Sequence, residues 1–167
     1  KSDNGAVVLG LASSDAIRAA AGAVAARAVR GADPDADTAV AARPALLVER
    51  MAPPGVELVV AARADGLVPT LVLGLGGIWT EALDDVAILP LPAAAGRIER
   101  ALRSLRGAAL LTGGRGREPI DLGAVSVAAS RAGEVLLAED LELVELNPLI
   151  AGPDGCTAVD AVARRRR

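Results

Sequence analysis

Helical periodicity of apolar residues marks three segments of the chain. A helix is predicted over residues 14–30, because Ser13–Asp15 offers capping oxygens ahead of an apolar-rich run and Gly31 follows it. A second helix is predicted to begin at Pro92 and to end at Gly107. Asp121 is placed to cap a third helix that reaches about Leu137.

Short apolar runs bounded by Gly, Pro or charged residues predict strands. These runs are Ala6–Leu9, Ala45–Met51, Val56–Arg63, Val68–Leu73, Leu141–Leu146 and Cys156–Val162. Residues 31–44 show little periodicity and are predicted to be a loop. Because the helices and strands mix without strict alternation, the pattern favours an α+β fold over a doubly wound sheet.

The last two predicted strands are joined by a turn signal. Gly152–Gly155 has Pro at its second position and Gly at its fourth. In an antiparallel hairpin the numbers of facing residues have a constant sum, and a turn centred between Pro153 and Asp154 makes that sum 307. Asn147 and Asp160 then face each other, with side chains about 5 Å apart. A two-residue turn of this type splays hairpin strands, so a longer loop is the alternative.

Oxygen-bearing side chains gather on one face of this hairpin. Glu145 lies two residues from Asn147 and therefore shares its face, while Val144, Leu146 and Ile150 are expected to point the other way, into an aliphatic core. Two carboxylates and an amide form a site suited to Mg²⁺, which prefers oxygen ligands and completes its shell with waters and phosphates. The alternative is an ordinary solvated face, and the spacing by itself leaves both open.

A glycine run, Gly74–Gly77, follows a predicted strand. It is not a P-loop, because no Gly-Lys-Ser/Thr follows, and Trp79 stands where a dinucleotide fingerprint needs its third Gly. Glycines here either let backbone N–H groups approach an anion or form a tight turn between sheet elements. Glu81, just beyond, is either a second carboxylate near a metal or a solvated residue.

Composition excludes several function classes. The 167 residues suit one domain, and they contain no His, one Cys and 1% aromatic residues. Histidine-based catalysis within this chain, a structural zinc site and a disulfide framework are therefore excluded or disfavoured, and aromatic platforms for nucleic acid are absent. No apolar run reaches the roughly 18 residues of a membrane span. The single Cys fits a reducing compartment, so we expect a cytoplasmic protein. We also expect neither nucleic-acid nor membrane partners.

A collinear series of motifs covers essentially the whole chain. The motifs are Lys1–Asp3 with Gly5, Glu49–Met51, Gly55–Leu58, Gly74–Ile78 with Glu81, Arg115–Gly116, Asp121, Glu145–Leu149 and Asp160. In this order they resemble the ATP-grasp domain of ADP-forming acyl-CoA (acetyl-CoA) synthetases. The same domain type occurs in large bacterial protein lysine acetyltransferases, and succinyl-CoA synthetase β chains are more distant relatives.

The resemblance implies an ATP-grasp fold that holds ATP and Mg²⁺ between two α+β lobes. Residues 1–62 would form the adenine-side lobe and residues 63–167 the metal and phosphate-side lobe. In the synthetases this domain moves a phosphoryl group between ATP and a phosphohistidine on a CoA-binding or ligase domain or subunit. The absence of His from this chain agrees with that division of labour.

The resemblance also implies roles for individual residues. Asn147 and Asp160 would hold Mg²⁺, and Glu145 matches an acidic, catalytic position near the transferring phosphate. The predicted nucleotide contacts are Glu49, Arg50 and Met51 at adenine, Glu57 at ribose or the metal side, and Gly76 and Gly77 in the glycine run.

Some positions depart from the family pattern. Family members carry further residues ahead of Lys1, including an ATP-binding Lys, so we expect the chain to lack the first strands of the fold. Ala6 replaces a Gly, and Leu89 stands where the family usually has Arg. These departures motivate an alternative function, a non-catalytic regulatory domain of the ATP-grasp type fused to a protein lysine acetyltransferase.

Overall fold

The computed structural model describes residues 7–30, 45–77 and 85–166, and the chain forms two compact units, Lys1–Met51 and Ala52–Arg167. The expected division into an adenine-side lobe of residues 1–62 and a metal and phosphate-side lobe of residues 63–167 stays a prediction. Strand β1 (Val56–Arg63) is a central strand of the second unit's sheet. The predicted loop at 31–44 lies outside the described residues.

The described part of the first unit contains the helix α1 (Ser14–Arg30), as predicted. Ser13 caps it through its hydroxyl, which accepts the Ala16 N–H at 3.2 Å, while its carbonyl accepts the Ile17 N–H at 3.0 Å in the first regular helical bond. The hydroxyl bond satisfies an N–H group that has no backbone partner inside the helix.

Two predicted strands of the first unit are wrong. Residues 7–9 and 45–51 belong to no strand in the structure. A strand needs a hydrogen-bonded neighbour, and the described residues of this unit contain no other strand to supply one. Apolar runs of this length therefore predict a strand only where a partner exists.

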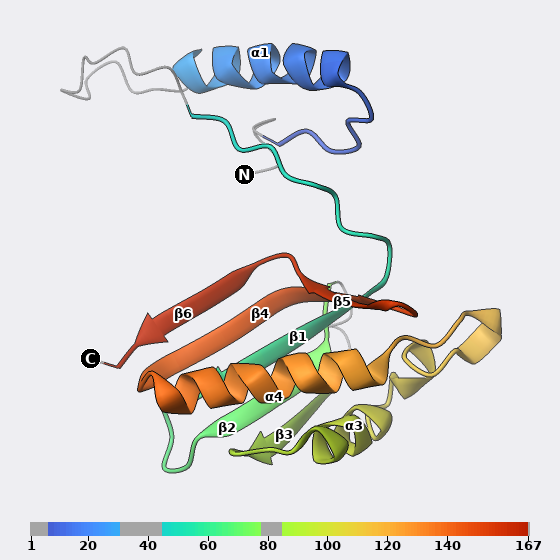
Figure 1. The fold of residues 1–167 in the computed structure, drawn as a ribbon, viewed down its shortest axis with the longest axis vertical. Coiled ribbons are helices and arrows are strands. Elements are labelled where there is room, and N and C mark those ends of the chain that lie inside the picture. The colour runs from blue at the N-terminus through green and yellow to red at the C-terminus, as the bar shows by residue number, and fades with distance from the viewer. Residues whose placement is uncertain (1–6, 31–44, 78–84, 167) are drawn as a thin grey trace. The chain divides into compact units, whose positions relative to one another are not determined.

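The second unit is built on a six-stranded antiparallel sheet (Figure 1). Its further strands are β2 (Thr70–Leu75), β3 (Val86–Pro90), β4 (Leu141–Gly152), β5 (Gly155–Ala158) and β6 (Ala161–Arg165). Their order is β3-β2-β1-β4-β5, and β6 also pairs with β4, beside its first half. The α+β prediction is thereby confirmed, although β3 was missed and the last predicted strand is divided into β5 and β6.

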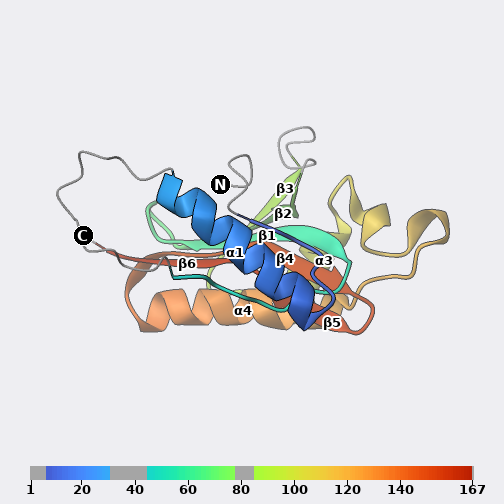
Figure 2. The same cartoon turned by 90° about the horizontal axis from the view of Figure 1, so that it is seen from above.

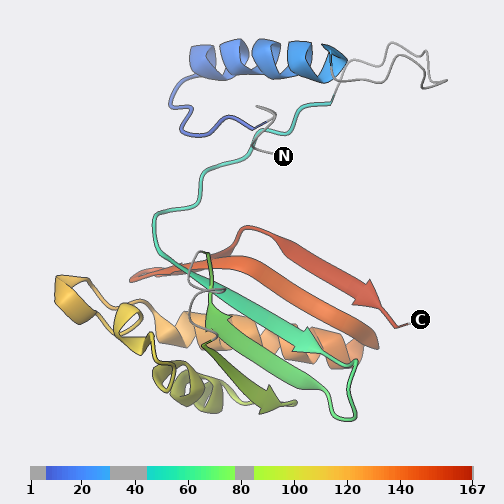
Figure 3. The same ribbon diagram turned by 180° about the vertical axis from the view of Figure 1, so that it is seen from behind.

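Helices α3 (Ala95–Arg103) and α4 (Leu122–Ala138) lie against one face of this sheet (Figures 1 and 3), and Figure 2 shows α4 below it. Short 3₁₀ turns at Ala108–Leu110 and Gly114–Gly116 connect them. Asp121 caps α4 as predicted, since its carboxylate accepts the Ala124 N–H at 2.8 Å. The opposite face of the sheet, which α3 and α4 leave uncovered, is called the helix-free face below.

The core lies between the sheet and the two helices and is wholly aliphatic. On β1, Leu58, Val60 and Ala62 are fully buried, and they meet Ile98 of α3 and Val125 of α4 in one cluster. Each fully buried Leu, Val or Ile contributes about 1.5–3 kcal/mol relative to an exposed one. Among the described residues, no helix combines the length and the apolar character that crossing a bilayer requires.

We predict that Ser126→Ala stabilises the protein. Ser126 is 1% exposed in α4, and its hydroxyl has no hydrogen-bond partner in the structure. Removing a buried, unsatisfied hydroxyl recovers about 1 kcal/mol of unfolding free energy, which a urea or thermal melt measures.

Ser130→Ala is the matched control, because it makes the same change in the same helix. The Ser130 hydroxyl donates to the carbonyl of Ala93 at 3.1 Å, so its loss is expected to cost about 1 kcal/mol relative to Ser126→Ala. Equal shifts in the two variants would contradict the assignment, since helix propensity changes equally in both.

Candidate metal and phosphate site

The hairpin register predicted from the sequence is confirmed. Leu149 pairs with Ala158 and Gly152 pairs with Gly155, which leaves a two-residue turn and a constant sum of 307. Beyond β5, the N–H of Asn147 donates to the carbonyl of Asp160 at 3.1 Å, and β6 continues in the same register. The backbone therefore places Asn147 directly opposite Asp160.

The alternation of side chains along β4 is interrupted next to Asn147. Two of its residues, Asn147 and Pro148, lie opposite the single residue Val59 of β1, which forms a β-bulge. Val144 and Leu146 face the core as predicted, but the expectation for Ile150 is wrong. Ile150 pairs with Glu57 on the helix-free face, because the extra residue reverses the alternation of every later side chain.

Glu145 and Asn147 are neighbours on the helix-free face. The Nδ2 amide of Asn147 donates to Oε1 of Glu145 at 3.1 Å. This bond orients the amide, because its nitrogen must face the carboxylate and its Oδ1 then turns away from Glu145. Oδ1 is an oxygen acceptor of the kind that Mg²⁺ binds.

The carboxylates of Glu145 and Asp160 have no salt-bridge partner among the described residues. Nearby arginines are engaged elsewhere: Arg164 pairs with Glu142 at 2.9 Å, and Arg63 pairs with Asp65. The Arg63 hydrogen bond holds the pKa of Asp65 below its usual value. Among the described residues, neither Glu145 nor exposed Asp160 makes a salt bridge, so both remain available to a divalent cation.

The described residues contain no group of three or more His, Cys, Asp or Glu side chains arranged to hold a metal. Protein oxygens would therefore supply only part of a coordination shell here. That is the usual situation for Mg²⁺, which keeps waters and takes further oxygens from substrate phosphates. The donor set of one carboxylate and one oriented amide oxygen fits Mg²⁺ in this mode.

The glycine run packs against Glu57. The N–H of Gly76 donates to the Glu57 carbonyl at 2.7 Å, so this N–H is not free for an anion. A Cβ on Gly76 would lie 3.0 Å from the Glu57 carbonyl carbon, and a Cβ on Gly77 would lie 2.7 Å from Glu57 Oε2. Gly77 also has φ +65°. Close approach to β1 therefore explains both glycines, and their contact with a nucleotide stays a prediction.

Glu57 and Glu145 share the helix-free face but not one cluster. Glu145 pairs with Ala61, four residues along β1 from Glu57. At about 3.3 Å per residue their backbones are about 13 Å apart. Glu57 thus lies apart from Glu145, as different roles at ribose and phosphate would require.

The predicted adenine segment belongs to the first unit. Glu49, Arg50 and Met51 are exposed, and the structure does not place them relative to the hairpin. Glu81 and Trp79 lie outside the described residues.

Comparisons with known proteins identify the family and the fold. A family model described as an ATP-grasp domain matches residues 1–164. The chain belongs to the ATP-grasp domain family. Its fold resembles a dinucleotide-forming acetyl-coenzyme A synthetase from Ca. Korarchaeum cryptofilum, solved with coenzyme A and Mg-AMPPCP and with its phosphohistidine segment pointing towards the nucleotide-binding site. The TM-score is 0.82 at 33% identity, over 99% of this chain and 70% of that one.

Curated relatives of this ATP-grasp domain include two ADP-forming acetate–CoA ligases. The β subunit of the Pyrococcus furiosus ligase I is 31% identical over 94 residues, which is 56% of this chain and 40% of the relative. Ligase II of Archaeoglobus fulgidus is 34% identical over 99 residues, 58% of this chain and 15% of the relative. The chain therefore spans less than half the length of these curated relatives.

The role of Asp85 and the packing of Leu89 were not found from the sequence. Asp85, just before β3, accepts the N–H groups of Arg106 at 2.9 Å and Gly107 at 2.8 Å, and it anchors the chain after α3. Leu89, where synthetases usually have Arg, pairs with buried Leu71 and packs against the core. This departure lies on the helix-covered face and does not touch the candidate site.

Cys156 is half-buried on β5, and burial, followed by the charge of Asp121, raises the pKa of its thiol. A raised pKa keeps the thiol protonated near neutral pH and makes it a poor nucleophile. This agrees with a site that acts through oxygen ligands.

We predict that Gly77→Ala destabilises the ATP-grasp domain by about 1–2 kcal/mol, the cost of a left-handed backbone for a residue with a Cβ. The contact with Glu57 adds to that cost. Gly66→Ala is the control, because its Cβ would meet only the Val68 carbonyl oxygen at 3.9 Å and its φ is not positive. Chemical denaturation compares them, and equal stability of the two variants would contradict the prediction.

Proposed function

We propose that this chain holds Mg-ATP for phosphoryl transfer in an ADP-forming acyl-CoA synthetase. The observation that carries the proposal is the pairing of Asn147 with Asp160 on the hairpin, beside a Glu145 that orients the amide. The ligands of the Korarchaeum relative support it, since that protein was solved with Mg-AMPPCP and coenzyme A.

In this proposal each protein group has one task. Asp160 and Oδ1 of Asn147 supply two oxygens to Mg²⁺, and the remaining positions go to water and phosphate oxygens. The metal, when bound, neutralises charge that develops on the phosphates. Glu145 holds the Asn147 amide in its binding orientation and lies near the transferring phosphate.

Further nucleotide contacts are part of the proposal. Glu57 lies further along β1, on the same face, where a ribose hydroxyl is the expected partner. The backbone of Glu49–Met51 would bind adenine, and Gly76 and Gly77 would border the nucleotide through their contact with Glu57.

The acceptor of the phosphoryl group lies outside these residues. In the forward step a histidine ring nitrogen attacks the γ-phosphorus, the bond to the β–γ bridging oxygen breaks, and ADP leaves. These 167 residues contain no His, so the nucleophile must come from a partner domain or subunit that also carries the CoA chemistry. A cytoplasmic location, where ATP is available and a lone Cys stays reduced, completes the proposal.

The regulatory alternative loses part of its motivation. It was favoured by the replacement of Arg at position 89, but Leu89 faces the core and leaves the helix-free face unchanged. The full-length reading frame discriminates further, because an adjoining acetyltransferase domain favours regulation and an adjoining CoA-binding domain favours synthesis.

We predict that Asp160→Asn weakens Mg-ATP binding by the full-length protein at least tenfold, a loss of about 1.4 kcal/mol, because a metal-binding carboxylate is neutralised. Asp154→Asn, the same change at the exposed hairpin turn, is the control and is expected to bind normally. Isothermal titration measures both. Equal affinities of the two variants and the native protein would remove Asp160 from the site.

We predict that Glu145→Gln lowers the rate of phosphoryl transfer about 10–100-fold, the usual effect of losing a group that orients a metal ligand. Transfer is measured as base-stable, acid-labile label from γ-labelled ATP on the histidine-bearing partner. If the regulatory alternative is correct, the native protein transfers no label. If the native protein transfers label and Glu145→Gln transfers the same amount, only the role of Glu145 is contradicted.

A further inference from the structure

Strand β3 forms an outer edge of the sheet, since among the described strands it pairs only with β2. The N–H of Leu91 donates to the Pro69 carbonyl at 2.9 Å, which shows which alternate residues of β3 hydrogen-bond to β2. Because residues of an antiparallel strand bond alternately to either side, Leu89 and Ala87 bond to β2. Val86 and Ile88 therefore turn their N–H and C=O groups outward.

This edge has little of the usual protection against pairing. Natural edge strands carry charged residues, bulges or prolines that discourage a further strand. Strand β3 has no charged residue, and only Pro90 at its end removes a donor. On the helix-free face, Val86 is 48% exposed and Ile88 is 61% exposed.

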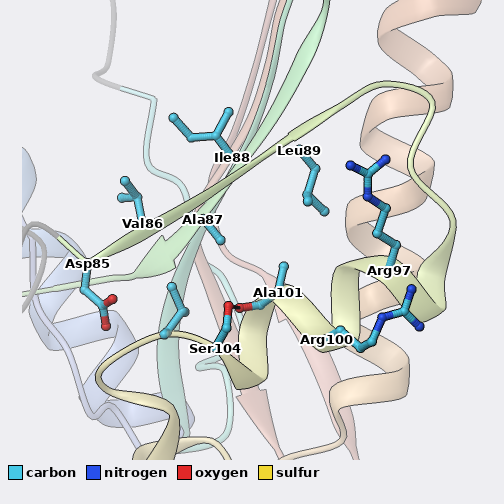
Figure 4. Close-up of a pocket in the computed structure, with 10 residues that line it drawn as sticks. Asp85, Val86, Ala87, Ile88, Leu89, Arg97, Arg100, Ala101 and Ser104 are labelled. Atoms are coloured by element: carbon cyan, nitrogen blue, oxygen red, sulfur yellow. Dashed lines mark hydrogen bonds between the residues drawn. The ribbon is translucent and has the colours of Figure 1, made fainter.

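A groove of about 500 Å³ runs along the helix-covered side of the same edge, between β3 and α3 (Figure 4). Arg97 and Arg100 line it together with Leu89, and neither has an acidic partner among the described residues. By contrast, Arg103 on the same helix pairs with Glu99 at 2.8 Å. The carboxylate of Asp85 lies at the other end of the groove (Figure 4).

We propose that β3 is a self-association edge, on which the β3 strand of a second copy of this chain pairs antiparallel. The outward groups select one register. If Val86 pairs with Ile88 of the second copy, all four outward N–H groups of the two strands find carbonyl acceptors. The two-fold axis then passes between the two Ala87 residues. Shifting the pairing so that Ile88 faces Ile88 sets Val86 against Pro90, which has no N–H.

The side chains complement one another in the same register. On the helix-free face, Val86 meets Ile88 of the second copy twice, which covers the exposed apolar pair. On the helix-covered face, Asp85 lies opposite Leu89 of the second copy and so approaches its Arg97 and Arg100. The groove is acidic at one end and basic at the other. A two-fold axis places the acidic end of each copy beside the basic end of the other copy.

A peptide from a different protein would have to supply this apolar and charge pattern independently, whereas a second copy carries it already. The two-fold arrangement is also closed, so it gives a dimer and not a fibre. The contact is short, so we expect a dimer that dissociates on dilution.

Analytical ultracentrifugation of the chain over a range of concentrations tests the proposal. We expect the mass to approach that of a dimer at high concentration, and Ile88→Lys to shift the monomer–dimer midpoint at least tenfold upward. Leu67→Lys is the matched control, because Leu67 is fully exposed on the β1–β2 turn, and it is expected to dimerise like the native chain. Arg97→Glu combined with Arg100→Glu should weaken the dimer through repulsion by Asp85.

Cross-linking tests the register. With Cys156 replaced by Ala, Ala87→Cys is expected to form a disulfide-linked dimer under mild oxidation, and Leu67→Cys is not. Circular dichroism checks that each variant is folded. A chain that stays monomeric at all concentrations, a dimer that Ile88→Lys leaves intact, or a dimer that Ala87→Cys fails to link would each overturn the proposal. A monomer that gains mass only with an added extended peptide would assign the edge to another partner.

Discussion

The antiparallel pairing of β4 with β5 and β6 is the constraint on which the candidate site depends. A two-residue turn fixes the register of the hairpin, and the pairs as far as Leu143 and Arg164 follow from it. Asn147 and Asp160 are thirteen positions apart in sequence, yet the backbone holds them opposite each other. Because side chains alternate between faces, a slip of one residue would send one of them into the core.

A β-bulge lets β4 serve the core and the site at once. Val144, Leu146 and Leu149 all face the helices, although strict alternation from Leu146 would turn Leu149 outward. The extra residue at Asn147–Pro148 absorbs the difference, and it does so beside the proposed Mg²⁺ ligands. Bulges commonly occur where a strand must aim side chains for function. The helix-covered face can therefore be purely aliphatic while the other face collects carboxylates.

The two faces and the two ends of the sheet thus have different chemistry. The helix-free face near β4 carries the oxygen-bearing side chains of the candidate site, whereas the β3 end presents backbone groups and apolar side chains. Asp85 connects the start of β3 with the segment that follows α3, because its carboxylate accepts the N–H groups of Arg106 and Gly107. The proposed metal site lies at β4 and the proposed self-association edge lies at β3, so the two proposals concern different parts of the sheet.

Local signals in the sequence determined the caps at Ser13 and Asp121, the helices α1 and α4, the bounds of β1 and the register of the last hairpin, because each depends on residues close together in the chain. The motif series also identified the family. Tertiary structure decided that the apolar run Ala45–Met51 has no strand partner, that Ile150 faces outward and that Val86–Pro90 is an edge strand. These outcomes depend on which distant segment supplies hydrogen bonds or adds a residue opposite, and no local pattern carries that information.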